Sequence, residues 1–166
     1  MVDRTIPDLS VLAGAVIDRA IKAGVMITTA ESCTGGMVAA ALTDIAGASA
    51  VLDCGVVTYS NAAKTDLLGV PEAVLHAHGA VSPQTAAAMA DGALRAAPDA
   101  GIAVAITGIA GPGGGSADKP VGLVWFGLAC RDGDTVTAHH IIPGDRKEVR
   151  QQAAAIALGM IVNRLS

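Results

Sequence analysis

A short apolar run that ends in a polar, glycine-rich turn constrains the fold of this chain more than any other feature. Residues 25–29 are apolar or β-branched, which is typical of a buried strand, and an alanine-rich segment that reaches about Thr43 has the composition of a helix. Residues 31–36, Glu-Ser-Cys-Thr-Gly-Gly, lie between them, and their glycines permit a tight turn and close approach to a ligand. This order predicts a βα unit that presents side chains at the carboxyl edge of a sheet.

Strands and helices alternate along the rest of the chain. Further strands are expected at residues 53–60, 102–107, 121–129 and 135–142. Helices are expected from Asp8 to Gly24, from a cap at Asn61 to Gly69, from Ser82 to about Ala97, and from the capping-box pair Asp145 and Glu148 onward. An Asp-Gly turn between the last two strands predicts an antiparallel hairpin. We therefore predict a single domain of residues 1–166, a three-layer α/β/α sandwich on a mixed, mostly parallel sheet of about five strands with one antiparallel strand.

Three polar segments follow predicted strands and should meet at one sheet edge. They are residues 31–36, residues 59–64 and residues 107–115. Ligands of open α/β sheets bind beyond the carboxyl ends of the strands. The convergence of these segments predicts a binding or catalytic site there.

The composition argues against several classes of partner. The net charge is -4, the 11 Lys and Arg are scattered, and the chain has one Trp, one Tyr and one Phe, so nucleic-acid binding is not expected. No apolar run reaches the roughly 18 residues that span a bilayer, and the first residues do not resemble a secretion signal. Three cysteines without a CxxC pair favour a reducing compartment. We expect a cytoplasmic protein.

Ser32 is the candidate nucleophile, and Lys64 is its candidate base. A serine hydroxyl needs an adjacent base, and a desolvated lysine can serve. The four histidines form two pairs, 76/78 and 139/140, away from the strand end that carries Ser32. The alternatives are a capping role for Ser32, a solvated role for Lys64, and Cys33 as a rival nucleophile that we rank second and favour as a packing residue. Glu31 either orients a polar group or complements the helix dipole.

The glycine-rich segment 108–116 is either a flexible loop or an anion site. Successive N–H groups of such a loop can cradle a phosphate, although the segment matches neither the P-loop nor the dinucleotide fingerprint. Arg146, at a predicted helix start, is either a second phosphate contact or a solvated residue. No His, Cys, Asp or Glu cluster has metal-ligand spacing, so we expect no metal.

The ordered segments resemble those of the CinA carboxy-terminal domain family, the nicotinamide-nucleotide amidohydrolases. The resemblance extends over about residues 8–164 and rests on Thr29-Ala-Glu-Ser-Cys-Thr-Gly-Gly36, Gly55-Val-Val-Thr-Tyr-Ser-Asn-Ala-Ala-Lys64, His78-Gly-Ala-Val-Ser82, Thr107-Gly-Ile-Ala-Gly-Pro-Gly-Gly-Gly115, Lys119-Pro-Val-Gly122 and Gly144-Asp-Arg146. The chain resembles the stand-alone form. Ala62 departs from the glutamate of many relatives, which puts one peripheral polar contact in doubt.

The resemblance implies hydrolysis of the carboxamide of nicotinamide mononucleotide to nicotinic acid mononucleotide and ammonia, in pyridine-nucleotide salvage and without a cofactor. It implies that Ser32 attacks, that Lys64 transfers protons, and that Tyr59 assists. N–H groups around residues 33–36 are expected to hold the oxyanion. The predicted substrate-binding residues are Glu31, Cys33, Thr34, Gly35, Gly36, Thr107, Gly108, Gly111, Gly113, Gly114 and Arg146.

Two other functions remain open at this point. One is a non-catalytic nucleotide-binding or regulatory module of the same fold, and the other is a Ser-Lys amidase for another small amide. Because a binding module needs no Ser-Lys pair, Ser32 and Lys64 distinguish the first alternative from an enzyme. The alanine-rich helix faces and the habits of the family suggest a homo-oligomer, with a dimer as one form.

Overall fold

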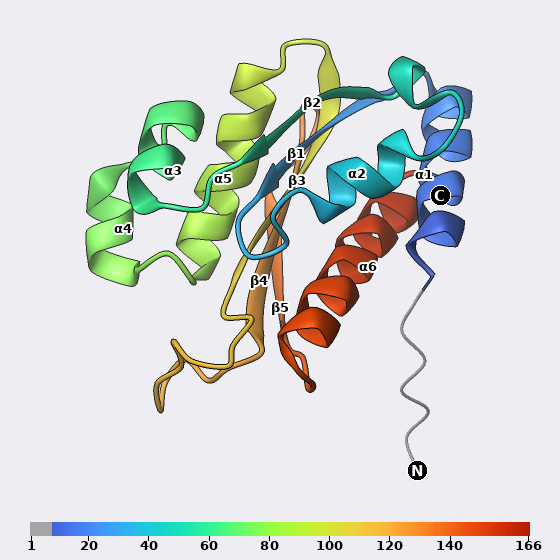
Figure 1. Ribbon diagram of the computed structural model, residues 1–166. Helices are drawn as coiled ribbons and strands as arrows, with labels where there is room; N and C mark the ends of the chain where they lie inside the picture. The colour runs from blue at the N-terminus through green and yellow to red at the C-terminus, as the bar shows by residue number, and fades with distance from the viewer. Residues whose placement is uncertain (1–7) are drawn as a thin grey trace.

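One five-stranded sheet organises the residues that the computed structural model describes, 8–166 (Figure 1). Its strands are β1 (Met26–Glu31), β2 (Leu52–Val57), β3 (Ala100–Gly108), β4 (Leu123–Cys130) and β5 (Val136–Ile141). Their order is β2-β1-β3-β4-β5; β1 is parallel to β2 and β3, and β4 is antiparallel to both of its neighbours. The predicted mixed sheet with one antiparallel strand is confirmed.

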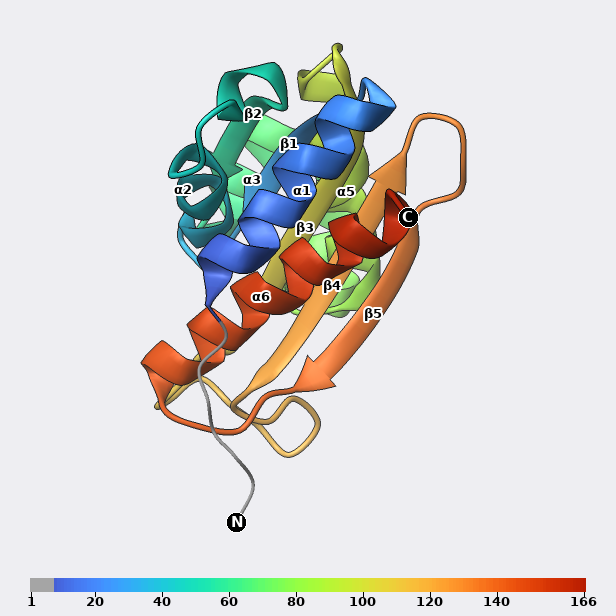
Figure 2. The same cartoon turned by 90° about the vertical axis from the view of Figure 1, so that its right-hand side faces the viewer.

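Helices cover both faces of the sheet. One face carries α1 (Leu9–Ala23), α2 (Met37–Thr43) and α6 (Arg146–Arg164), with α1 and α6 side by side (Figure 2). The other face carries α3 (Asn61–Leu68), α4 (Glu72–His78) and α5 (Pro83–Ala96) (Figure 1). A short 3₁₀ turn, Ala48–Ala50, precedes β2. Two apolar clusters lie on opposite faces of the sheet, which confirms the three-layer sandwich.

Capping residues set most helix boundaries where the sequence predicts them. Asp8 accepts from the N–H of Ser10 at the start of α1, and Asp145 forms a capping box at the start of α6. One predicted cap was wrong by a residue. Ser60 accepts from the N–H of Ala63, so Asn61 is the first helical residue of α3. Helix α4 was not predicted, and it places two of the four histidines in its last turn.

The order of the strands brings the three polar segments together. β1 is central, and Glu31 at its end is in register with Val57 of β2 and Ile106 of β3. The chain leaves all three strands at the same edge because these strands are parallel. The residues that follow them therefore face one another.

Candidate active site

Ser32 and Lys64 are hydrogen-bonded at the carboxyl edge of the sheet. Ser32 directly follows β1, and Lys64 lies in α3, which follows β2. The Lys64 Nζ atom donates to Ser32 Oγ over 3.1 Å and to the Thr58 carbonyl oxygen over 2.7 Å. Ser32 is 8% exposed and Lys64 is 1% exposed. The two residues that the sequence singled out thus form a buried pair.

Burial changes the protonation equilibrium of the lysine. Loss of hydration lowers the pKa of Lys64 from its ordinary value, and negative charge on the nearby Cys33, when its thiol ionises, has a smaller, opposite effect. A lysine with a lowered pKa is neutral at a lower pH and can then accept a proton. At the 3.1 Å separation, the Ser32 hydroxyl can donate to a neutral Nζ.

A cavity of about 260 Å³ opens onto this pair. Ten of its lining residues belong to the set predicted from the sequence: Ser32, Cys33, Tyr59, Lys64, Thr107, Gly108, Gly111, Gly113, Gly114 and Arg146. Ala80, Val81, Ile109 and Ala110 complete the lining. The cavity therefore draws on the segments after β1, β2 and β3 and on the start of α6.

The turn after β1 is built around the buried carboxylate of Glu31. This carboxylate accepts from the Thr34 hydroxyl over 2.6 Å and from the N–H groups of Gly36, Val38 and Ala39 over 3.1, 3.2 and 2.9 Å. It thereby caps α2 and complements the positive end of the helix. Glu31, Thr34, Gly35 and Gly36 are absent from the cavity lining, which favours a role in shaping the turn.

Two N–H groups at the cavity, those of Cys33 and Gly108, have no backbone acceptor within residues 8–166. The N–H of Gly35 donates to the Ser32 carbonyl over 3.0 Å, whereas that of Cys33 donates to no backbone carbonyl of the described residues. In β3 the Ile106 carbonyl faces Ser32 and the N–H of Ile109 faces β4, so alternation along the strand turns the Gly108 N–H toward Ser32. A Cβ at residue 108 would lie 2.9 Å from the Leu123 carbonyl oxygen, so the close approach of β4 requires glycine there.

Arg146 and Tyr59 form the open rim of the cavity. Arg146 donates to the Gly111 carbonyl over 2.7 Å and to the Tyr59 hydroxyl over 2.9 Å. Both side chains are exposed, Tyr59 to 61%. The arginine therefore links the glycine-rich loop to the segment after β2 and leaves cationic surface beside the cavity.

Cys33 lies beside the serine but is poorly suited to be the nucleophile. Burial raises the pKa of its thiol to about 11. The thiolate is the reactive form, and it is scarce at neutral pH when the pKa is this high. The geometry thus favours Ser32 over Cys33.

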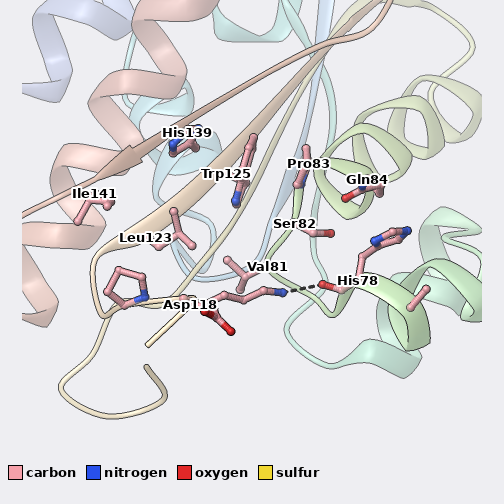
Figure 3. Close-up of a pocket in the computed structure, with 13 residues that line it drawn as sticks. His78, Val81, Ser82, Pro83, Gln84, Asp118, Leu123, Trp125, His139 and Ile141 are labelled. Atoms are coloured by element: carbon pink, nitrogen blue, oxygen red, sulfur yellow. Dashed lines mark hydrogen bonds between the residues drawn. The ribbon is translucent and has the colours of Figure 1, made fainter. Parts of the chain in front are cut away.

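The histidines at the surface lie at a different hollow. His78 and His139 line a hollow of about 530 Å³ together with Trp125, whose ring centroid is 4.4 Å from that of His139 (Figure 3). Val81 is the one residue that this hollow shares with the Ser32 cavity. No histidine lines the Ser32 cavity, so lysine is the candidate base.

Sequence reasoning did not identify Arg150, and it did not assign residues 80–81 to the site although they lie in one of the motifs that carry the resemblance. Arg150, in α6, donates to the carbonyls of Cys33 and Thr34, each over 3.0 Å. The Ala80 carbonyl accepts from the Thr107 hydroxyl over 2.6 Å. Both contacts join segments that are distant in the chain, so neither contact can be predicted from local sequence.

Two further features describe the chain between residues 8 and 166. No group of three or more His, Cys, Asp or Glu side chains is arranged to hold a metal ion in this part. Nor does it contain a helix with the length and hydropathy that a bilayer crossing requires.

Known proteins resemble this chain in sequence and in fold. The family model of the CinA C-terminal domain matches residues 9–165. Nicotinamide-nucleotide amidohydrolase PncC of Enterobacter agglomerans is 55% identical over 95% of this chain and 94% of its own length. A CinA-like protein of Mycolicibacterium gilvum is 53% identical over 92% of this chain but only 37% of its own. The crystal structure of competence/damage inducible protein CihA from Agrobacterium tumefaciens has a TM-score of 0.91 and 49% identity over 95% of each chain. The chain belongs to the CinA C-terminal domain family.

Proposed function

We propose that the chain is an amidohydrolase that converts nicotinamide mononucleotide to nicotinic acid mononucleotide and ammonia, in pyridine-nucleotide salvage. The observation that carries the proposal is the buried contact of 3.1 Å between Lys64 Nζ and Ser32 Oγ at the base of a cavity. The relative that is 55% identical over nearly the full length of both chains is a nicotinamide-nucleotide amidohydrolase, which supports a nicotinamide nucleotide as the substrate.

The first half of the reaction forms an acyl-enzyme. Neutral Lys64 accepts the Ser32 hydroxyl proton while Oγ attacks the carboxamide carbon. The carbonyl π electrons move to oxygen, and the free N–H groups of Cys33 and Gly108 stabilise this oxyanion. As the intermediate collapses, the C–N bond breaks, and the Lys64 ammonium protonates the departing nitrogen, which leaves as ammonia.

The second half consumes one water molecule. Lys64, neutral again, takes a proton from water as the oxygen attacks the Ser32 ester. Collapse of this second intermediate breaks the ester bond, returns the proton to Ser32 Oγ and releases the carboxylic acid. The sum is amide plus water giving acid plus ammonia, with one base used twice.

The open rim is suited to the charged part of the nucleotide. Arg146 offers a guanidinium at the cavity mouth, and the cavity is also lined by Gly111, Gly113 and Gly114. A phosphate at this rim places the other end of the ligand toward Ser32. Tyr59 assists by holding the guanidinium through its hydroxyl group.

The test is ammonia release from nicotinamide mononucleotide by the purified protein, with a chelator present because no metal takes part in the proposed steps. The Ser32→Ala variant is expected to lose activity while remaining folded by circular dichroism. Ser49→Ala, at an exposed serine of the 3₁₀ turn, is the matched control and should keep full activity. Turnover by Ser32→Ala at the wild-type rate would refute the mechanism.

The same assay separates the alternatives. A folded wild-type protein that binds the nucleotide without releasing ammonia would be a binding module. Faster release from nicotinamide, or from another small amide, than from the nucleotide would instead indicate a Ser-Lys amidase for a different substrate.

We also propose that residues 1–166 act as one catalytic domain, in the cytoplasm and as a homo-oligomer such as a dimer. Light scattering on the purified protein tests the oligomeric state. A mass equal to that of one chain across the working concentration range would contradict it.

A further inference from the structure

Arg150 contacts the backbone of the turn that carries Ser32, the candidate nucleophile. The residue lies in α6, one turn after the Arg146 that borders the cavity, and it does not line the Ser32 cavity itself. Its Nε atom donates to the Cys33 carbonyl and its Nη2 atom to the Thr34 carbonyl, each over 3.0 Å. One planar guanidinium thus binds two consecutive carbonyls of the chain directly after Ser32.

These contacts complete the restraint of three successive peptide groups. The Gly35 N–H holds the Ser32 carbonyl, which fixes the peptide that bears the Cys33 N–H. Arg150 holds the next two peptides through their carbonyls. Within residues 8–166 the Cys33 carbonyl has no other donor. Without the guanidinium, a buried carbonyl loses its partner and the turn must rearrange to restore one.

We propose that Arg150 is a positioning residue for catalysis: its double contact with the Cys33 and Thr34 carbonyls holds Ser32 and the Cys33 N–H in the geometry that the tetrahedral intermediate requires. The inference rests on the proposed Ser32 mechanism. An oxyanion donor is effective only when it is aimed in advance at the position of the developing charge. A residue with this role affects the transition state more than substrate binding.

The charge of Arg150 also reaches the turn. Burial dominates the pKa of the Cys33 thiol and raises it, and Arg150 acts in the opposite direction by stabilising the thiolate. A cation that favours negative charge on this residue also favours an oxyanion beside its N–H. Replacing Arg150 by a neutral residue removes both the two hydrogen bonds and the positive charge.

The test compares Arg150→Met and Arg150→Lys with the wild type in steady-state and single-turnover ammonia release. Arg150→Met is expected to lower kcat about 100-fold, in line with the loss of an aimed oxyanion donor, with little change in KM. Arg150→Lys keeps the charge but loses the planar guanidinium that donates to two carbonyls, so its kcat should lie between those of the wild type and Arg150→Met. Free guanidinium ion should restore part of the activity of Arg150→Ala.

Arg131 supplies the matched control. It donates to the carbonyls of Ala100, Leu94 and Ala97, so it is also an arginine that holds backbone carbonyls, but it does not line the cavity. Arg131→Met should lower the melting temperature and leave kcat unchanged. The inference is overturned if the Arg150 variants keep wild-type kcat, or if their loss appears in KM alone. If the wild type itself releases no ammonia, the proposed function fails and the inference fails with it.

Discussion

The two ends of the Ser32 cavity differ in their contact with water. At the inner end, Lys64 and Thr107 are each 1% exposed and Ser32 is 8% exposed. At the outer end, Tyr59 is 61% exposed, and Arg146 and the glycines at 113 and 114 are also exposed. Both ends belong to one cavity and are built from neighbouring segments.

This difference separates two tasks. Burial at the inner end lowers the pKa of Lys64 and strengthens the interactions that stabilise a developing charge. A wet outer end admits a charged ligand, and its contacts weaken as salt screens them. We therefore expect substitutions at the inner end to affect kcat and those at the outer end to affect KM.

The largest effect is expected from Lys64→Met at the inner end. Removing the base should lower kcat by about 10³-fold, within the range found for general base catalysis. Ammonia release under saturating substrate measures it. Lys22→Met, at the exposed end of α1, is the control and should retain full activity.

Lys64→Met also tests the lowered pKa of Lys64, through the pH dependence of the free energy of unfolding. Between the lowered pKa of folded Lys64 and the ordinary value of 10.5, the unfolded chain binds more protons than the folded one. Wild-type stability should therefore rise with pH through this window relative to Lys64→Met. Urea unfolding at a series of pH values measures the difference, and identical slopes for the two proteins would contradict it.

Glu31→Gln should destabilise the turn after β1, which forms part of the inner end of the cavity. The amide cannot accept all the hydrogen bonds that the carboxylate accepts from the Thr34 hydroxyl and three backbone N–H groups. We expect a loss of about 3 kcal/mol in the free energy of unfolding, as for other broken buried charge contacts. Urea unfolding measures it against Glu72→Gln, at the exposed start of α4. Equal stability of the two variants would show that Glu31 does not support the turn.

Arg146→Met tests the outer end. Because the guanidinium is at the open rim, we expect KM to rise about tenfold with kcat nearly unchanged, the pattern of a lost uniform binding contact. The salt dependence of KM should also decrease. Steady-state kinetics at low and high ionic strength measure both, with Arg95→Met as the control. A fall in kcat without a change in KM would place Arg146 in the chemical step.

The smallest effect is expected from Cys33→Ser. A packing residue tolerates this nearly isosteric change at a cost of about 1–3 kcal/mol for burying a hydroxyl group. The variant should therefore keep most of its ammonia release. Loss of activity as complete as that of Ser32→Ala would make the thiol the nucleophile.

Local patterns were enough to predict most elements of the fold. Residues 25–29 and 102–107 showed the composition of buried strands, and the caps at Asp8, Ser82 and Asp145 marked helix starts because a capping hydrogen bond spans only two or three residues. Helix α4 was missed because Pro71 caps it without a side-chain hydrogen bond. The rule that parallel strands end at one edge predicted that the Ser32 and Lys64 segments would meet.

The sequence by itself determined the alternation of strands and helices and the candidates Ser32 and Lys64, because periodicity, caps and the strand-end positions of polar residues depend on neighbouring residues, whereas the role of Tyr59 was implied by the family resemblance. Only the tertiary structure decided that Lys64 is buried, that Glu31 caps α2, and that Arg150 contacts the turn after β1 from more than 100 residues away in the chain. The physical reason is that desolvation and backbone hydrogen bonding depend on which surfaces pack together, and packing is settled by the whole chain.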